Sequence, residues 1–275
     1  MIELAPHNPY GLSIHIPVLT AAGCFGYGVE YANSIDITRI GAIVTRSTSF
    51  YAQRQSQPRL IETPAGVLLT GTWPNPGLAY VLRHYAPIWA SWSTPVIVSI
   101  VGVGADEYAA IAAELEGVEG VAGIELNVAL HAAHAAQITS AVRAATQLPI
   151  LVKLPPSPEA EQLAQKVARA GADALTLFAP FPAAAPDPDT GALVEGWLLG
   201  PATRPLVQPM LRTLAGQLSI PIIACGGIAQ SSDAQQALVA GASAVQLGSV
   251  LLNTPQAVLQ IASALADYQP EPRPK

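Results

Sequence analysis

Two strand ends near the C-terminus decide the expected fold of this 275-residue chain, IPIIACGGI (220–228) and AGASAVQLGS (240–249). Each holds a short apolar run that ends at glycine. Such runs, bounded by glycine or proline, are typical of strands buried on both faces, as in parallel sheets. The second run follows a segment with helical spacing, and a glycine separates the two, as expected where a helix ends. The order helix, glycine, strand therefore indicates a β/α unit.

The same pattern recurs along the chain and predicts eight strands. The runs begin at Val18, Ala42, Val96, Gly123, Ile150, Ala174, Ile222 and Ala244. Five of the seven intervals between these starts are 22 to 27 residues long, which leaves room for one helix and two short loops, as parallel strands require. The pattern predicts an α/β fold, a closed (β/α)8 barrel. A doubly wound open sheet is the alternative, but no G-x-G-x-x-G turn follows an early strand.

The segments between the runs predict helices. Residues 105–115 and 159–170 carry apolar side chains at spacings of three and four. ARAGADALTL (168–177) and LVAGASAVQL (238–247) are similar to each other, each with glycine just past a helix end and a strand to follow. This weak internal repeat is typical of β/α architecture.

Two intervals, of 54 and 48 residues, are too long for one plain β/α unit. We expect one barrel domain over residues 1–268, with insertions at 48–95 and 181–199, and a C-terminal tail at 269–275. Both insertions follow the carboxyl end of a strand, so they are predicted to cover the barrel mouth. The sequence Asp-Thr-Gly at 189–191 is typical of a hairpin tip.

The composition excludes several classes of protein. Apolar residues make up 51% of the chain and charged residues 12%, which is typical of a core-rich globular protein. The net charge is −6 and lysine occurs only at 153, 166 and 275, so there is no basic stripe for nucleic acid. The two cysteines cannot form a disulfide framework, no apolar run is long enough to span a bilayer, and no signal peptide is recognisable. We expect a cytoplasmic protein without a membrane span.

Small residues at the ends of the seventh and eighth strands form the first candidate site. Gly226 and Gly227 follow one strand, and Gly248 and Ser249 follow the next. Small residues let backbone N–H groups approach an anion closely, and this end of a barrel frequently holds a phosphate. Glycines that only make tight turns are the alternative, and we favour a phosphate site because both loops are present.

Lys153 is the second candidate, because it lies between apolar residues in the strand ILVKLP (150–155). Strand alternation sends Leu151 and Lys153 to the same face. A lysine inside a barrel needs an anionic or strongly accepting partner, and a snorkelling or ion-paired lysine is the alternative. On the neighbouring strand, Glu125 and Asn127 share a face, and the amide of Asn127 either suits a polar heterocycle or closes a turn.

Three further side chains are weaker candidates. Cys24, in TAAGCFG (20–26), is either a thiol at the barrel mouth or a small buried hydrophobe. His131 and His134 are spaced to lie on one helical face, but no third ligand is in view, so we expect no metal. The tryptophans suit either an exposed interaction surface or packing over the mouth, at positions 73, 89, 92 and 197.

A series of motifs runs through nearly the whole chain in a recognisable order. They are TAAGCFGYGVEY (20–31), RIGAIVTRST (39–48), ETPAG (62–66), NPG (75–77), TPVIVSIVG (94–102), GIELNV (123–128), LPILVKL (148–154), LGPATRP (199–205), IPIIACGGI and AGASAVQLGS. Together they resemble the class 1 dihydroorotate dehydrogenases, particularly the bacterial type 1B subunits. The resemblance implies an FMN-containing (β/α)8 barrel that oxidises dihydroorotate to orotate in pyrimidine biosynthesis.

The resemblance also implies an FMN site. Gly226, Gly227, Gly248 and Ser249 match the phosphate loops of the family, with Ser249 where threonine is usual. Lys153 matches a lysine near the N1–O2 edge of the flavin, where positive charge stabilises the reduced cofactor. The other implied cofactor residues are Ala22, Arg46, Ser47, Ser99, Asn127 and Gly200. Of these, Arg46 stands where the family has a lysine and Ser99 where it has an asparagine.

The implied substrate side departs from the family pattern. Leu69 aligns with a loop asparagine, and Ala179 and Pro180 align with an asparagine–threonine pair, so this side is more apolar. Arg46 and Asn127 complete the implied substrate residues. Each missing hydrogen bond to a buried polar group of the substrate costs about 1–3 kcal/mol.

The family's catalytic base also has no counterpart. A cysteine in the family aligns with Leu130, which cannot take a proton, and the mobile loop after it is shortened. A positioned general base contributes about 10²- to 10⁴-fold in rate. His131, His134 and Cys24 are the candidate replacements, so no catalytic residue is assigned.

We therefore expect an FMN-dependent oxidoreductase that resembles dihydroorotate dehydrogenase but has altered or weakened substrate chemistry. The alternative is a catalytically inactive family member that acts as a flavin-binding, phosphate-binding or protein-interaction subunit. The expected partners are a small-molecule substrate, dihydroorotate or another, and a second copy of the chain in a dimer. Type 1B relatives pair with an electron-transfer subunit, which the resemblance makes a further expected partner.

Overall fold

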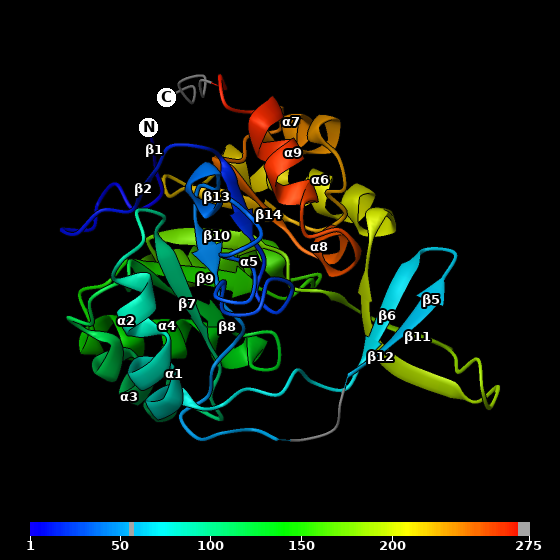
Figure 1. Ribbon diagram of the computed structural model, residues 1–275, viewed down its shortest axis with the longest axis horizontal. Helices are drawn as coiled ribbons and strands as arrows, with labels where there is room; N and C mark the ends of the chain where they lie inside the picture. The colour runs from blue at the N-terminus through cyan, green and yellow to red at the C-terminus, as the bar shows by residue number, and fades with distance from the viewer. Residues whose placement is uncertain (55–57, 269–275) are drawn as a thin grey trace.

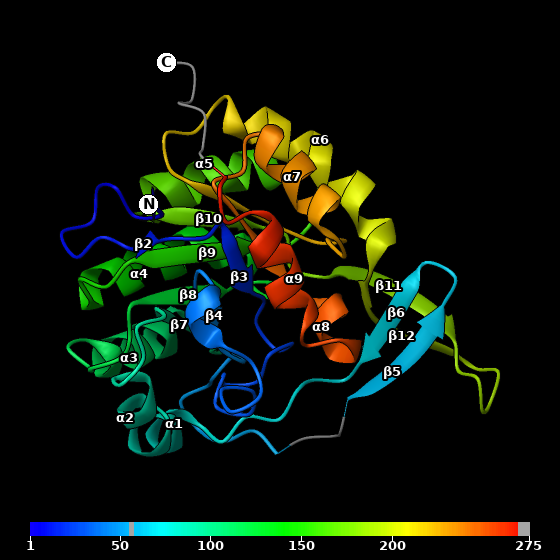
Figure 2. The same ribbon diagram turned by 45° about the horizontal axis from the view of Figure 1, so that its top comes forward.

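The computed structural model describes residues 1–54 and 58–268, and its main element is a barrel of eight parallel strands (Figures 1 and 2). The strands are β3 (Val18–Thr20), β4 (Ile43–Val44), β7 (Val96–Ile100), β8 (Gly123–Asn127), β9 (Ile150–Leu154), β10 (Ala174–Leu177), β13 (Ile222–Cys225) and β14 (Ala244–Leu247). Their order in the sheet is β3-β14-β13-β10-β9-β8-β7-β4, and a parallel bridge between Leu19 and Ala42 joins β3 to β4. The predicted barrel and its eight strands are confirmed, and the open sheet is wrong.

The strands form where the sequence predicts because both of their faces are buried. Inside the barrel, Leu19, Leu151, Ile223 and Ala244 belong to one apolar cluster. The outward-facing residues of the same strands pack against the surrounding helices in a second, larger cluster. Leu151 lies in the interior cluster, as the strand alternation predicts, and this places Lys153 on the interior face of β9 as well.

Helices cover the outside of the barrel, as Figure 2 shows. They are α3 (Ala105–Leu115), α4 (Ala135–Ala145), α5 (Ala160–Arg169), α6 (Arg204–Ala215), α7 (Ser231–Val239), α8 (Ser249–Asn253) and α9 (Ala257–Ala264). The bounds of α3 agree with the prediction, and α5 is one residue shorter at each end. Gly171 and Gly241 follow α5 and α7 with φ of +105° and +108°, so the predicted glycine ends of these helices are confirmed.

A short N-terminal hairpin lies at the amino ends of the barrel strands. It consists of β1 (Ile2–Glu3) and β2 (Ser13–Ile14), which pair antiparallel. Leu4 and Leu12 join the apolar cluster inside the barrel, and both are buried. The Glu3 carboxylate accepts hydrogen bonds from the N–H groups of Ala5 at 2.8 Å and Leu12 at 2.6 Å. The hairpin thus covers the end of the barrel opposite the candidate site.

The two long insertions meet in one four-stranded antiparallel sheet beside the barrel mouth (Figures 1 and 2). Its order is β11 (Phe181–Pro186), β12 (Leu193–Leu199), β6 (Gly66–Thr70), β5 (Arg59–Thr63). Gly191, with φ of +72°, lies in the turn between β11 and β12, as predicted for the hairpin tip. Arg59 of the first insertion binds Asp187 of the second at 2.6 Å, so the two segments support each other.

The remainder of the first insertion forms α1 (Leu78–His84) and α2 (Ala86–Trp89). Trp89 is fully buried, and its Nε1 donates to the carbonyl of Tyr27 at 3.1 Å. An exposed interaction surface at Trp89 is therefore wrong, because its ring belongs to the packing around the barrel. The predicted C-terminal tail, 269–275, lies outside the described residues.

Candidate functional site

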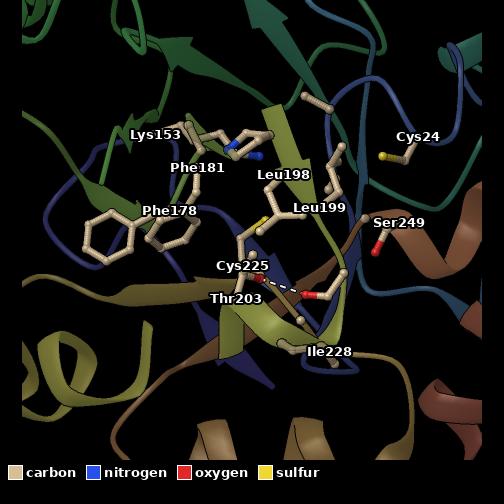
Figure 3. A pocket seen from close by; sticks show the side chains of 18 residues that line it. Cys24, Lys153, Phe178, Phe181, Leu198, Leu199, Thr203, Cys225, Ile228 and Ser249 are labelled. Atoms are coloured by element: carbon tan, nitrogen blue, oxygen red, sulfur yellow. Dashed lines mark hydrogen bonds between the residues drawn. The ribbon is translucent and has the colours of Figure 1, made fainter. Parts of the chain in front are cut away.

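A pocket opens at the carboxyl ends of β3, β9, β10, β13 and β14 (Figure 3). One side of it is made of small residues and loop backbone, including Ala22, Gly200 and Ser249. The other side is apolar, with Phe178, Phe181 and side chains from β12. The predicted residues that line this pocket are Ala22, Cys24, Lys153, Ala179, Pro180, Gly200, Gly226, Gly227, Gly248 and Ser249.

The glycines after β13 are required by the backbone and by close packing. Gly226 and Gly227 have φ of +126° and +70°, which side-chain-bearing residues rarely adopt. A Cβ on Gly227 would lie 2.6 Å from the backbone nitrogen of Arg204, whose segment packs directly beneath the loop. Within the described part of the chain, the N–H groups of Gly226 and Gly227 donate no hydrogen bond.

Gly248 differs in having a negative φ of −108°, although its ψ of −102° lies outside the usual α and β regions. A Cβ there would meet only Ala21 Cβ at 3.7 Å and Cys24 Sγ at 3.8 Å, both of residues that line the pocket. The N–H groups of Gly248 and Ser249 also lack a hydrogen-bond acceptor among the described residues. Two loops that line the same pocket therefore carry backbone N–H groups without an acceptor among the described residues, and loops of this kind can bind an oxyanion.

The segment LGPATRP brings a third backbone element to the pocket. Gly200 has φ of +134°, and its carbonyl accepts from the Thr203 hydroxyl at 2.9 Å, drawn as a dashed line in Figure 3. A Cβ on Gly200 would lie 2.9 Å from the Cα of Gly66, so glycine is needed where the two insertions approach each other. Thr203 lines the pocket and was not predicted, although it lies inside a recognised motif.

Lys153 reaches the pocket from inside the barrel, with its side chain buried (Figure 3). Its Nζ donates to Gln246 Oε1 at 2.8 Å and lies 3.6 Å from Glu125 Oε1. Gln246 Nε2 in turn donates to Glu125 Oε2 at 2.6 Å, and the hydroxyl of Thr176 donates to the same oxygen at 3.2 Å. The anionic partner that an interior lysine needs is therefore Glu125, with Gln246 bridging the pair.

The charge state of this end of the pocket follows from its neighbours. Burial alone would lower the pKa of Lys153, but the adjacent Cys225 and Glu125 outweigh burial and raise it above its usual value. Burial, with Cys225 adding to it, raises the pKa of the Cys24 thiol to about 12. Burial likewise raises the pKa of Cys225. At neutral pH the pocket therefore presents an ammonium group and two protonated thiols.

Ser47, Ser99 and Asn127 form a second polar cluster on the adjacent strands. Asn127 Nδ2 donates to Ser47 Oγ at 3.2 Å, and Ser47 Oγ lies 2.9 Å from Ser99 Oγ. In the register of β8 and β9, Asn127 is the partner of Lys153, so the two clusters are neighbours. These three residues do not line the pocket that contains the glycine loops, although the structure does bring them together.

Arg46 lies next to this second cluster in sequence and is held by aromatic rings. Its guanidinium carbon is 5.4 Å from the centroid of the Trp73 ring and 5.9 Å from that of Tyr27. Nη1 donates to the carbonyl of Pro74 at 3.2 Å, whereas the buried Nε has no hydrogen-bond partner within the described residues. A buried donor without a partner is costly, so Nε is available to an acceptor on a ligand.

The residues aligned with the substrate side separate in space. Ala179 and Pro180 line the pocket directly after β10. Leu69 lies in β6 of the insertion sheet, where it is buried and pairs with Trp197 of β12. This side of the site consequently offers carbon surface, and its side chains supply neither a hydrogen-bond donor nor an acceptor.

The position aligned with the family base lies away from the pocket. Leu130 is 68% exposed, in the loop after β8. His134 is exposed, and the ring of His131 packs edge-on against Tyr108 with 6.4 Å between centroids. Neither histidine lines the pocket, whereas Cys24 does. The pKa of about 12 keeps the Cys24 thiol protonated at neutral pH, which counts against it as a base.

Gln246 and Thr176 belong to the site and were not predicted. Gln246 lies two residues after Ala244, an interior residue of β14, so strand alternation already sends its side chain into the barrel. A polar residue at an interior strand position was therefore the signal. Among the described residues, no group of three or more potential metal-ligating side chains comes together.

The fold and the site define a (β/α)8 barrel protein with a pocket at the carboxyl ends of its strands. A family model described as dihydroorotate dehydrogenase matches residues 6–268. Similar proteins are called dihydroorotate dehydrogenase B (NAD(+)), catalytic subunit. One from Pelobacter propionicus is 36% identical over 96% of this chain and 93% of its own length. Another, from Desulforamulus reducens, is 35% identical over 92% and 89%.

A third such protein, from Porphyromonas gingivalis, is 34% identical over 94% of this chain and 90% of its own length. The chain belongs to the dihydroorotate dehydrogenase family. The resemblance to the type 1B branch, read from the motifs, is thereby confirmed.

Proposed function

We propose that this chain is an FMN-dependent oxidoreductase of the dihydroorotate dehydrogenase type whose substrate chemistry has changed. The observation that carries the proposal is the pocket itself. It combines the ammonium of Lys153 with two loops whose N–H groups have no acceptor among the described residues. A phosphate and a ring system that gains negative charge on reduction need these two kinds of donor. The family membership supports the same cofactor.

The residues present fit FMN in this pocket. Gly226, Gly227, Gly248 and Ser249 would hold the phosphate through their N–H groups, because no acceptor in the described chain uses them. The small Ala22 leaves space on one wall. FMN supplies the two-electron acceptor that such an oxidation needs. Lys153 holds its proton at neutral pH and presents a fixed positive charge to the pocket.

A second polar group supports the binding of a heterocycle nearby. Ser47, Ser99 and Asn127 offer both donors and acceptors, and the Nε of Arg46 is without a partner among the described residues. We propose that Arg46 and Asn127 face the substrate or the ring edge of the cofactor. The apolar Leu69, Ala179 and Pro180 are then the substrate-side positions, which favours a less polar substrate than dihydroorotate.

The alternative function is a family member that binds the cofactor without turnover. One observation favours it: apart from Lys153, the described residues that line the pocket include no titratable side chains except Cys24 and Cys225. Both are buried thiols with raised pKa values, so neither supplies a base at neutral pH. Bound cofactor without reduction by any candidate substrate is the signature of this alternative.

We also propose the setting in which the chain works. The similar proteins are named catalytic subunits, which supports a role beside a second subunit. The resemblance to the type 1B branch favours an electron-transferring subunit and a homodimer. The composition supports a cytoplasmic location. Over the described residues, the structure holds no helix with the length and apolar character needed to cross a membrane.

An anaerobic visible spectrum tests the proposal. The purified chain is loaded with FMN, and the spectrum is recorded before and after adding dihydroorotate and a series of less polar analogues. The proposal expects a bound-flavin spectrum that bleaches slowly or not at all with dihydroorotate and faster with a less polar analogue. Rapid bleaching by dihydroorotate would contradict the changed chemistry, and no bleaching by any analogue would favour the binding role.

A further inference from the structure

Three buried polar side chains from three strands account for how Lys153 is held. Its ammonium group has three N–H donors. One donates to Gln246 at 2.8 Å, while the 3.6 Å distance to Glu125 Oε1 is an ion-pair distance and too long for a hydrogen bond. At least one donor is therefore left for a ligand in the pocket that Lys153 lines.

Within the described residues, Glu125 accepts hydrogen bonds on one of its two carboxylate oxygens. Its Oε2 accepts from Gln246 at 2.6 Å and from Thr176 at 3.2 Å, whereas the buried Oε1 has no hydrogen bond from the described residues. A buried carboxylate with an unpaired oxygen is a costly arrangement, retained here next to the ammonium of Lys153. Gln246 joins the two charges, since its amide oxygen faces the lysine and its amide nitrogen the carboxylate.

At neutral pH the groups around Lys153 leave Glu125 as its one negatively charged partner within the described residues. From β8 comes Glu125, from β13 the thiol of Cys225, from the loop after β3 the thiol of Cys24, and from β14 the neutral Gln246. Thr176 of β10 reaches only Glu125. Both thiols are protonated at neutral pH, so the charge of the pocket wall is set by the ammonium and one carboxylate.

We propose that Glu125, acting through Gln246, is a positioning residue that fixes the ammonium of Lys153 at the pocket wall and offsets part of its positive charge. The effect on the cofactor rests on the proposed function, because it requires FMN in this pocket. The effect on Lys153 does not depend on the proposed function. Removing the carboxylate should lower the pKa of Lys153. At neutral pH, where the lysine stays protonated, this change should also make the pocket more positively charged.

The composition of the chain makes the first effect directly measurable. Lysine occurs only at 153, 166 and 275, so a protein labelled with ¹³C at the lysine Cε gives three signals. The variant Lys153→Arg identifies the signal of Lys153. In the FMN-free native protein this signal should keep its ammonium position up to about pH 10, since even an ordinary lysine titrates near 10.4. In Glu125→Gln the titration midpoint should fall by about 1–3 pH units.

Two further variants separate charge from packing. Thr176→Val removes a hydrogen bond to Glu125 but keeps the carboxylate, so the Lys153 midpoint should stay within about 0.5 pH units of the native one. The exchange variant Glu125→Gln/Gln246→Glu moves the carboxylate to the side chain whose oxygen lies 2.8 Å from Nζ, and it should restore the native midpoint. If Glu125→Gln does not fold, the exchange variant alone decides.

An unchanged midpoint in Glu125→Gln, or a lowered midpoint in the exchange variant, would overturn the assignment. The cofactor effect is then measured as the reduction midpoint potential of bound FMN at pH 7, which should rise in Glu125→Gln and return toward the native value in the exchange variant. If the reduction potential of bound FMN in Glu125→Gln equals that of the native protein, the proposed effect on the cofactor is wrong. If FMN does not bind to any of the proteins, the proposed function fails while the lysine titration still tests Glu125.

Discussion

Gln246 Oε1 accepts a hydrogen bond from Lys153 Nζ at 2.8 Å, although 93 residues separate the two along the chain. The contact joins β9 to β14 across the interior of the barrel, where an apolar side chain would otherwise lie. It turns two isolated polar residues into one network with Glu125, and the network ends at the pocket. The interior of this barrel therefore serves both packing and the site.

Removing the positive charge should destabilise the fold. Lys153→Met leaves Glu125, which is fully buried, without its ionic partner. Breaking a buried pair by removing one partner costs about 3–5 kcal/mol, while replacing both partners by apolar residues is often neutral. We expect Lys153→Met to lose about that much unfolding free energy and Lys153→Met/Glu125→Leu to recover most of it, as measured by urea denaturation. Equal unfolding free energies of Lys153→Met and Lys153→Met/Glu125→Leu would contradict a buried ion pair between Lys153 and Glu125.

The two glycine loops should respond differently to alanine. Gly248→Ala places a methyl group among pocket atoms at ordinary contact distances, so it should destabilise the fold less than Gly227→Ala while FMN affinity falls about tenfold or more. Gly227→Ala forces an alanine to φ of +70° and against Arg204, and should destabilise the fold by about 1–2 kcal/mol or more.

A matched control for these glycine variants is Gly104→Ala. Gly104 has an extended backbone, and a Cβ there meets nothing within 4 Å. It lies outside the pocket, so both stability and FMN affinity should stay at native values. Loss of FMN affinity in Gly104→Ala as large as in Gly248→Ala would place the effect outside the pocket.

The two thiols should be unreactive in the native protein. Cys24 and Cys225 are both free and buried, and the pKa of Cys24 is raised to about 12. At pH 8 this leaves a thiolate fraction about 10³-fold below that of an ordinary cysteine with a pKa of about 8.5. Native protein should therefore react very slowly with Ellman's reagent, and unfolded protein should react at both sites at once. Fast labelling of the native thiols would show that the pocket wall is open.

Acid should weaken the N-terminal hairpin through Glu3. Burial raises the pKa of Glu3, but the hydrogen bonds from Ser13, Leu12 and Ala5 outweigh burial and hold it below its usual value. A group whose pKa is lowered by folding stabilises the fold above its unfolded pKa and loses that effect as the pH falls through its folded pKa.

The matching variant is Glu3→Gln. Native protein should exceed it in unfolding free energy at pH 7, and the difference should shrink as the pH falls below about 4.3, the ordinary pKa of glutamate. Urea denaturation at a series of pH values measures this. A difference that grows toward acid would mean that the carboxylate is not held by these donors.

The barrel strands were predictable because a strand buried on both faces is a short continuous apolar run. Such a run can be recognised without knowing which strand it pairs with. The strands of the insertion sheet are only partly buried and are not continuous apolar runs. β11 contains two prolines in FPAAAP (181–186), a composition that argues against a strand, yet it is an edge strand where proline is tolerated. Its pairing with β12 and the contact of β12 with β6 join segments far apart in sequence.

The parts of the site that depend on a single strand or turn were predictable, and the contacts between distant strands were not. The glycine ends of β13 and β14 follow from turn chemistry, and an interior Lys153 follows from alternation. The partner of Lys153 did not follow from the sequence. Glu125 was predicted only to share a strand face with Asn127. Which strands face each other across the barrel is decided by closure. Alternation therefore sends Gln246 into the barrel, but its pairing with Lys153 and Glu125 could be found only in the structure.

The central claim is that the glycine loops and Lys153 form an FMN pocket, and a paired binding titration tests it most directly. Flavin fluorescence is followed while the FMN-free chain is titrated into FMN and, separately, into riboflavin, which lacks the phosphate. The N–H groups of the loops, which have no acceptor in the described part of the chain, predict tight FMN binding and riboflavin binding weaker by about 100-fold or more. Equal affinities for the two flavins, or no binding of either, would contradict the account.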